Sequence, residues 1–419
     1  MVHSYTTTIG DIAQLFDGPH ATPKKIQSGP YFLSISSLEK GRLNLEKSAF
    51  LSESDFQKWT KRVTPEEGDL LFSYETRLGE AALMPSGIRA CLGRRMGLLR
   101  PNRKKVLPEY FLYAYLSPAF QQIINANTIK GATVNRIALN ELPNFDIRIP
   151  PIEEQRLVSE LLANIDKKIE LNNRINAELE AMAKTLYDYW FVQFDFPDAN
   201  GQPYKIAGGK MVYNPTLKRE IPEGWEDTTI EKTESNIVTG KTPSKQKPEY
   251  FDGDIPFITI GDIRGNTFIV STEETLSKQG ADTQSGKYLP EDSICVTCIA
   301  SPGLVGFVTQ RAQTNQQINS VICKNEINKY FLYFAMKGYF EGAKAKTGNT
   351  FANMNKGDFS DIKVLSPSTQ ELQSFHEIVQ PIFQKIKKCS LENFELQQLR
   401  DWLLPMLMNG QVTIKQKAS

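Results

Sequence analysis

Two kinds of hydrophobic pattern alternate along this chain of 419 residues. Residues 1–150 and 226–367 carry short runs of β-branched and aromatic residues between Gly, Pro and Asn, which is typical of strands joined by turns. Each of these stretches also carries one short apolar helix pattern, at residues 109–115 and 328–336. Pattern alone therefore predicts two units of mixed α and β structure.

After each of these units the apolar positions recur every seven residues, which predicts a long helix. We expect one column of each helix to form a packing seam: Val158, Ile165, Asn172, Leu179 and Leu186 in the first, and Phe375, Ile382, Cys389, Leu396 and Leu403 in the second. A second, mostly apolar column follows the first at a spacing of three residues. A helix of about 58 Å, at ~1.5 Å per residue, needs a partner for such a seam. We therefore predict that the helices pack antiparallel on each other; the alternative is that each packs on its own globular unit.

The two halves of the chain are imperfect copies of each other. Residues 31–38 match 256–263 at an offset of 225, residues 109–113 match 329–333 at 220, and from Gly131 onward the offset is 217. We predict an α+β fold with two globular α/β domains separated by two long antiparallel coiled-coil helices, related by an internal pseudo-twofold repeat. The predicted boundaries are domain 1 at 1–150, long helix 1 at 151–195, a connector at 196–225, domain 2 at 226–367, long helix 2 at 368–410 and a tail at 411–419.

The charge of the chain is nearly balanced, with 49 Lys and Arg against 48 Asp and Glu. Such a balance argues against a nucleic-acid partner, because phosphates need a basic surface. However, residues 1–151 hold 19 basic against 14 acidic side chains, and residues 152–195 hold 5 against 9. The basic excess therefore lies in the first unit, where residues 94–105 include six cations and no acid. A plain solvated surface is the alternative explanation for that run.

Several loops combine cations with Asn, Gln, Ser or Thr, a mixture suited to phosphates and base edges. The candidate DNA-binding residues of the first unit are Lys24, Lys25, Arg77, Arg94, Arg95, Arg103, Lys104, Lys105, Lys130, Thr133, Asn135 and Arg136. Those of the second unit are Lys241, Thr242, Ser244, Lys245, Lys247, Asn315, Gln316, Lys344, Lys346, Asn349 and Thr350.

Catalytic and metal-binding motifs are scarce in the sequence. The chain has three His and five scattered Cys, which favours a reducing compartment and leaves little material for a metal site. Cys295 and Cys298 lie three residues apart in a predicted strand, so we expect two buried thiols on opposite faces. The first residues match no export signal, and we expect a cytoplasmic protein. A metal-dependent nuclease using Asp69 and Glu75 is an alternative.

Several short motifs, repeated in order, resemble the specificity subunits of type I restriction–modification enzymes. They are the duplicated plan, Pro-Glu-Gly-Trp at residues 222–225, Gly-x-Thr at 131–133 and 348–350, and Ile-Pro-Pro-Ile-Glu-Glu-Gln at 149–155. The resemblance covers essentially the whole chain.

The resemblance implies two target recognition domains that each read one half of a gapped, bipartite DNA sequence. It also implies that the long helices dock methyltransferase subunits, which supply S-adenosylmethionine chemistry on adenine, and that a motor–nuclease subunit adds ATP- and Mg²⁺-dependent cleavage. This chain itself would be non-catalytic and hold no cofactor. A coiled-coil adaptor that binds proteins without DNA specificity is the competing interpretation.

Overall fold

The computed structural model describes residues 5–19, 22–39, 41–131, 134–347 and 353–414. The chain forms two compact units: unit 1 comprises residues 1–168 and 396–419, and unit 2 comprises residues 169–395. Each long helix therefore contributes one part to each unit. Within the described ranges, no helix is both long and apolar enough to cross a membrane.

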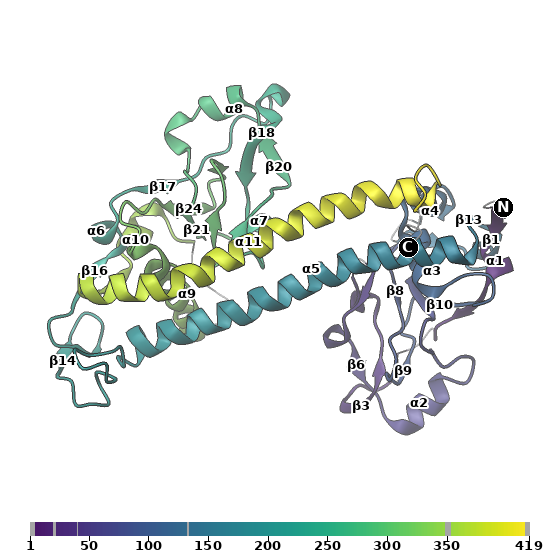
Figure 1. Ribbon diagram of the computed structural model, residues 1–419, viewed down its shortest axis with the longest axis horizontal. Helices are drawn as coiled ribbons and strands as arrows, with labels where there is room; N and C mark the ends of the chain where they lie inside the picture. Colours follow the sequence, from purple (N-terminus) through teal and green to yellow (C-terminus); the bar gives the residue numbers. More distant parts are fainter. Residues whose placement is uncertain (1–4, 20–21, 40, 132–133, 348–352, 415–419) are drawn as a thin grey trace, which may run out of the picture. The chain divides into compact units, whose positions relative to one another are not determined.

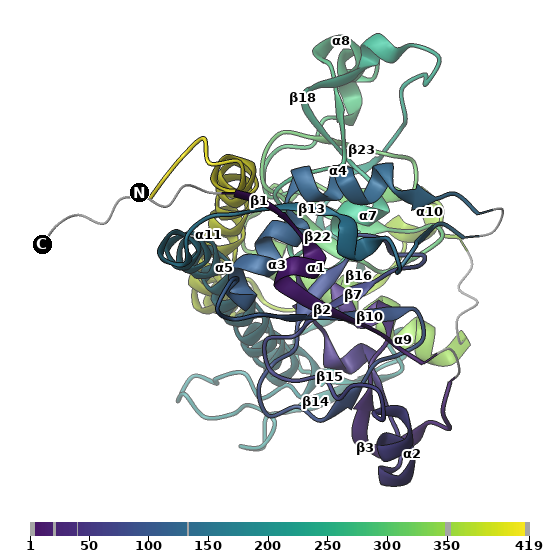
Figure 2. The ribbon, with the colours of Figure 1, turned by 90° about the vertical axis from the view of Figure 1, so that its right-hand side faces the viewer.

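Unit 1 is built on a four-stranded antiparallel sheet in the order β2-β10-β7-β8, of which β2, β10 and β7 lie side by side in Figure 2. Its strands are β2 (Ala13–Asp17), β10 (Met96–Pro101), β7 (Leu70–Ser73) and β8 (Ala81–Leu83). Both faces of β7 are buried. Leu70 and Phe72 pack with helix α3 (Pro108–Leu116), whereas Leu71 packs with Leu98 on the other face. Because neither face of β7 meets water, its sequence is a continuous apolar run and does not alternate with polar residues.

The remaining strands of unit 1 form smaller sheets. β3 (Ile26–Phe32) lies between β6 (Ala49–Phe50), which is antiparallel to it, and β9 (Ala90–Cys91), which is parallel. Three further pairs are β1 (Tyr5–Thr8) with β13 (Asp146–Ile149), β4 (Leu38–Glu39) with β5 (Arg42–Leu43), and β11 (Thr128–Ile129) with β12 (Arg136–Ile137). The short helices are α1 (Ile9–Ile12), α2 (Glu53–Trp59) and α4 (Pro118–Ala126).

Unit 2 repeats this plan, which confirms the predicted duplication. Its main sheet has the order β17-β24-β21-β22-β19, and a second sheet has the order β20-β18-β23; β17, β24, β21, β18 and β20 are labelled in Figure 1. The strands are β17 (Ile237–Thr239), β24 (Ile318–Val321), β21 (Ile294–Thr297), β22 (Val305–Val308), β19 (Phe268–Ile269), β20 (Glu274–Leu276), β18 (Phe251–Ile258), β23 (Gln313–Thr314) and the pair β16 (Glu226–Thr229) and β25 (Lys363–Ser366). The helices are α6 (Ile230–Thr233), α7 (Ile260–Ile263), α8 (Lys278–Asp282), α9 (Asn328–Thr347) and α10 (Lys356–Ser360).

The long helices are α5 (Ile152–Tyr187), which continues as a π-helical turn over Asp188–Val192, and α11 (Thr369–Met408). Prolines precede both helices at positions where a missing N–H is harmless. Gln155 is buried at the start of α5. Its Oε1 accepts from the backbone N–H of Leu107 at 2.8 Å, and its Nε2 donates to the carbonyls of Lys105 and Pro150 at 3.0 and 2.8 Å. This side chain therefore fastens the helix start to the globular part of unit 1.

The predicted antiparallel packing of the two helices is confirmed (Figure 1). In unit 2, Asn172 of α5 donates to Asn393 of α11 at 3.0 Å, and Asn176 donates to Ser390 at 3.3 Å. In unit 1, Arg400 of α11 pairs with Asp166 of α5 at 2.9 Å. Residue numbers rise along one helix as they fall along the other.

The predicted seam column is buried or half-buried, but its companion column differs from the expectation. Val158, Ile165, Asn172, Phe375, Ile382 and Cys389 are buried, and Leu179, Leu186, Leu396 and Leu403 are half-buried. The second buried column follows four residues later, not three: Ala183 is fully buried, whereas Met182 is 47% exposed. A shift of one residue turns the column by about 100°, at 3.6 residues per turn. It arises because the same side of each helix also covers a globular part; Phe383 of α11, for example, packs on Phe307 and Tyr330.

The predicted connector, residues 196–225, is a packed element of unit 2. It contains a hairpin of β14 (Met211–Asn214) and β15 (Arg219–Pro222). The rings of Phe196 and Trp225 stack with centroids 5.0 Å apart, and both side chains are buried. The Gly and Pro of this segment therefore form turns between packed aromatic residues.

Candidate nucleic-acid interface

Because the strands are antiparallel, several loops lie together at one end of each main sheet, where strands begin and finish; this end is called an edge below. In unit 1, Met96 at the start of β10 faces Ser73 at the end of β7, and Gly97 faces Asp17 at the end of β2. The described loops at this edge are therefore residues 18–19 and 22–25, 33–37, 74–80 and 92–95; we call them the loop edge of unit 1. Loops at the end of a rigid sheet are where binding residues usually lie.

The tight turn at residues 93–96 presents Arg94 to solvent. The N–H of Met96 donates to the carbonyl of Gly93 at 3.2 Å, which closes the turn. Arg94 is exposed and has no hydrogen-bond or ion-pair partner in the part of the chain that the structure describes. Its neighbour Arg95 instead pairs with Glu75, with 2.7 Å between Nε and Oε2. Of the two arginines of this turn, only Arg94 is therefore available to a ligand.

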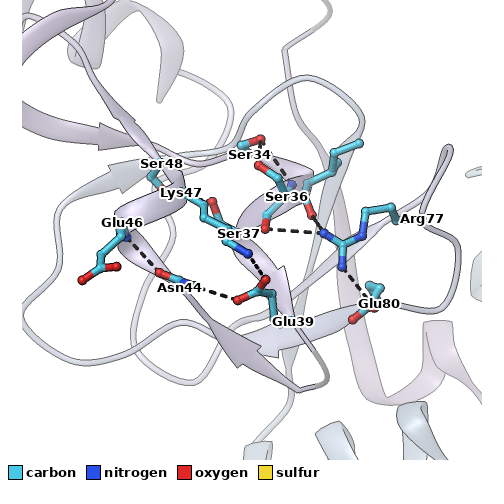
Figure 3. A network of polar contacts seen from close by, with 11 residues as sticks. Ser34, Ser36, Ser37, Glu39, Asn44, Glu46, Lys47, Ser48, Arg77 and Glu80 are labelled. Carbon is cyan, nitrogen blue, oxygen red and sulfur yellow. Dashed lines mark hydrogen bonds and ion pairs between the residues drawn. The ribbon is translucent and has the colours of Figure 1, made fainter. Parts of the chain in front are cut away.

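Arg77 is held within the protein, as Figure 3 shows. Its guanidinium donates to the carbonyls of Ile35 and Ser36 at 3.4 and 3.5 Å and pairs with Glu80 at 3.3 Å. These bonds join the β7–β8 loop to the loop after β3. The side chain is 36% exposed. Its contacts therefore hold two loops of the edge together.

A hollow of about 380 Å³ opens at the same edge. Its lining includes Lys25, Lys47 and Arg94 together with the hydroxyls of Ser34, Ser36 and Ser48. Lys47 is paired with Glu39, as Figure 3 shows, whereas Lys25 and its exposed neighbour Lys24 have no described partner. Unpaired cations beside hydroxyl groups suit a phosphate.

The basic run at residues 94–105 is divided by the fold. β10 separates Arg94 and Arg95 at its start from the cations after its end by six residues, or roughly 20 Å at ~3.4 Å per residue. At the far edge, Arg103 donates to the carbonyl of Glu67 and Lys105 to that of Asp11, while Lys104 is exposed. The run is therefore an extended strand whose cations do not form one cluster, and Lys104 lies at the end of the sheet opposite to Arg94.

The β11–β12 hairpin brings further candidates to the loop edge. The N–H of Thr76 donates to the carbonyl of Asn135 at 3.2 Å, and Arg136 forms a β-bridge with Glu75. Lys130, Asn135 and Arg136 are exposed. Thr133 lies outside the described residues.

Unit 2 has an equivalent loop edge at residues 240–247, 259–264, 298–304 and 315–317. Two sets of candidates that are distant in sequence meet there. The N–H of Lys241 donates to the carbonyl of Thr314 at 2.9 Å, and Thr242 Oγ1 donates to Gln316 Oε1 at 2.7 Å. Asn315 Nδ2 donates to Gln317 Oε1 at 3.1 Å, so Asn315 orders its own loop.

The other candidates of unit 2 are less concentrated. Ser244 is exposed, and Lys245 pairs with Glu274 at 3.4 Å. Lys247 donates to the hydroxyl of Tyr250 at 3.0 Å, and this bond raises the pKa of Lys247 above its ordinary value. Lys344 is exposed on α9, and Lys346 lies in the last turn of the same helix. Asn349 and Thr350 lie outside the described residues.

Three cations that the sequence analysis missed lie beside the loop edge of unit 1. Lys58, Lys61 and Arg62 line a hollow of about 290 Å³ with Trp59, Gly18 and Leu92. Arg62 pairs with Asp17 at 2.8 Å, and Lys61 is exposed. A Lys-Trp-x-Lys-Arg segment was the available signal, since it places cations around an aromatic ring.

The acids proposed for a nuclease serve as ion-pair partners. Asp69 is buried and holds Arg100 through two contacts of 3.0 and 2.8 Å, at the edge opposite to Glu75. No cluster of three or more His, Cys, Asp or Glu suited to a metal occurs among the described residues. Cys295 and Cys298 are buried in different apolar clusters, as their spacing predicted. Burial raises the pKa of these thiols to about 12 and about 11.

A family model described as the type I restriction modification DNA specificity domain matches residues 2–181 and again residues 222–400. The chain belongs to this family. The two matches coincide with the two copies of the fold, so each copy is one DNA specificity domain.

Named members of the specificity family extend the likeness over most of the chain. It is 32% identical over 370 residues to the specificity subunit of the type I restriction enzyme HindI of Haemophilus influenzae, covering 75% of this chain and 80% of that protein. It is 25% identical over 409 residues to the MjaIX specificity subunit of Methanocaldococcus jannaschii, covering 96% and 88%. The crystal structure of the S subunit of a type I restriction–modification system from M. genitalium matches with a TM-score of 0.59 at 14% identity, covering 97% and 96%. That last likeness shows the shared fold.

Proposed function

We propose that this chain is the DNA-recognition subunit of a type I restriction–modification complex and reads a bipartite target with its two loop edges. The family carries the assignment. The duplicated loop edges supply the physical means, since each combines a rigid sheet with exposed Arg, Lys, Gln and Asn side chains.

The chemistry of the complex belongs, in this proposal, to partner subunits. The chain would be non-catalytic, with S-adenosylmethionine, ATP and Mg²⁺ held by methyltransferase and motor–nuclease subunits. The engagement of Asp69 and Glu75 by arginines supports this division, because each carboxylate already serves as an ion-pair partner within the protein.

The long helices are the proposed docking surface for methyltransferase subunits. Apolar side chains remain exposed on them: Leu171 and Met182 on α5, and Ile378, Leu391, Leu399 and Trp402 on α11. Trp402 is 57% exposed, which is unusual for tryptophan outside an interface.

The test is a pair of matched charge reversals. Lys24→Glu with Lys25→Glu removes two unpaired cations at the loop edge, whereas Lys104→Glu reverses an exposed cation at the opposite edge of the same sheet. The logarithm of the binding constant falls linearly with the logarithm of the salt concentration. Each lost phosphate contact makes this slope shallower by about 0.9. We expect the double variant to bind all duplexes more weakly with a flatter salt dependence, and Lys104→Glu to bind as the unchanged protein does.

Binding is measured by titrating duplex DNA into the subunit assembled with its methyltransferase partner. Equal weakening by both variants would contradict the assignment of the loop edge. An assembly that binds no duplex at any salt concentration, but still binds the methyltransferase, would support the adaptor interpretation.

A further inference from the structure

The turn that carries Arg94 has an equivalent in unit 2, which hydrogen bonds identify. Gly18 donates to the carbonyl of Met96 at 2.9 Å, and Gly240 donates to that of Ile318 at 3.1 Å. The residues after β7 and β21 add a second match, because Tyr74 donates to the carbonyl of Arg95 and Cys298 to that of Gln317. Residues 93–96 and 315–318 therefore occupy the same place in the two copies.

Both turns close in the same way. Met96 donates to Gly93 at 3.2 Å, and Ile318 donates to Asn315 at 3.3 Å. The second residue of the turn is Arg94 in unit 1 and Gln316 in unit 2, and both are exposed. The third residue is held in both units, Arg95 by Glu75 and Gln317 by Asn315. The fold thus presents one side chain from this turn in each unit and restrains the next.

The two exposed side chains differ in their hydrogen-bonding groups, and each matches a different base. An arginine donates two parallel N–H groups to O6 and N7 of guanine, and a glutamine accepts from N6 and donates to N7 of adenine. Neither pairing can serve the other base, because the N6 amino group of adenine is a donor where the O6 of guanine is an acceptor. Gln316 is neutral, so in unit 2 this position adds nothing to the neutralisation of phosphate charge, while its amide can still pair with a base edge.

Gln316 is also oriented for such a contact. Thr242 Oγ1 donates to Gln316 Oε1 at 2.7 Å, which restrains the side-chain amide. A carbonyl oxygen has two lone pairs, so Oε1 keeps one for an amino group while both N–H groups of Nε2 stay unused by described residues.

We propose that the second position of this turn is a specificity-determining position in both units, with Arg94 reading a guanine in one half of the target and Gln316 an adenine in the other. The inference rests on the proposed function and adds to it the residue and the base at one position of each half-site. Thr242 acts as a positioning residue for Gln316.

The test exchanges the two residues in the full chain, assembled with its methyltransferase partner. The methylated motif is read by sequencing, and affinity is measured on duplexes altered at one base pair. Arg94→Gln is expected to convert one guanine of its half-site to adenine and leave the other half unchanged. Gln316→Arg is expected to make the reverse change in the other half. A bidentate pair discriminates against the wrong base by roughly tenfold to hundredfold, so each exchange should move relative affinities by that factor.

Matched controls make the same chemical changes at the opposite edges of the sheets. Arg89→Gln removes one charge before β9 in unit 1, and Gln310→Arg adds one after β22 in unit 2; both side chains are exposed. Neither should alter the motif. Thr242→Val should lower discrimination at the adenine several-fold without affecting the other half-site.

Two results would overturn the inference while leaving the proposed function intact. One is an unchanged motif in both exchanged proteins. The other is a uniform loss of affinity for all sequences with a flatter salt dependence in Arg94→Gln, which would make Arg94 a phosphate contact. Failure of the unaltered assembly to recognise any sequence would instead refute the proposed function.

Discussion

At the residue scale, equivalent positions in the two copies hold different residues that connect the same elements. Gln155 fastens the start of α5 with hydrogen bonds to three backbone groups, whereas Leu372, the matching residue of α11, is buried as an apolar side chain. Arg77 joins two loops of unit 1, and its counterpart Ser301 accepts a hydrogen bond from Arg264 at 3.3 Å. In both cases the contact between elements is kept while the residue that makes it changes.

His376 should make unit 2 sensitive to acid. It is buried at 6% exposure and stacks on Tyr330 with ring centroids 5.2 Å apart. Burial lowers the pKa of His376 below its ordinary value of 6.5, and Lys329 lowers it further against the opposing effect of Glu326 and Glu377. The unfolded chain therefore takes up a proton more readily than the folded chain, so stability should fall as the pH drops below 6.5 toward the folded pKa.

His376→Phe keeps the aromatic stack and removes the titration. We expect its free energy of unfolding at about pH 8 to lie within about 1.5 kcal/mol of the unchanged protein, as for other replacements of similar volume. Below about pH 6.5 it should lose less stability than the unchanged protein. Urea denaturation followed by the fluorescence of the buried Trp190 and Trp225 measures this in unit 2. An identical pH dependence in both proteins would show that another group is responsible.

At the element scale, the helix seam combines apolar packing with one polar layer. Asn172 is 1% exposed and Asn393 is 6% exposed, and the two side chains are hydrogen-bonded to each other. Asn393 also donates to Asn173 at 2.8 Å. Buried asparagines in a seam fix the register of helices at some cost in stability. The heptad pattern located Asn172, but Asn393 lies in the companion column four residues after Cys389, and choosing that column required knowledge of what else each helix covers.

A double-mutant cycle tests the polar layer. Asn172→Leu alone leaves Asn393 with a lost partner in the seam and should destabilise unit 2 by about 1–3 kcal/mol. Replacing both asparagines by Leu should recover most of that loss, because no buried polar group is then stranded. Urea denaturation gives the four free energies, and a coupling below about 0.5 kcal/mol would mean that the two residues act independently.

At the scale of the whole molecule, the duplication explains why a nearly neutral chain can still recognise DNA. The basic excess belongs to the first copy, whereas the second copy presents the neutral side chain of Gln316 at its loop edge. Neutral side chains read bases without neutralising phosphates. We therefore expect binding by unit 2 to depend less on salt than binding by unit 1.

The length of the long helices should set the gap between the two half-sites. Inserting seven residues after position 168 of α5 and after position 395 of α11 keeps the heptad register and adds about 10 Å of helix. At ~3.4 Å per base pair, the preferred gap should widen by about three base pairs. Methylome sequencing of a host that carries the lengthened subunit measures the gap. An unchanged gap would show that the length of the helices does not set the spacing between the half-sites.

The sequence by itself determined the duplication, the long helices, their antiparallel pairing and the burial of Cys295 and Cys298. These features follow from periodicity, which reports how each element meets water, and from repetition, which needs no coordinates. Only the tertiary structure decided which cations can reach a ligand. It separated Arg94 from Lys104 along a strand, paired Arg95 with Glu75 and brought Thr242 to Gln316. Such contacts join residues that are distant in the chain, and local pattern contains no record of them.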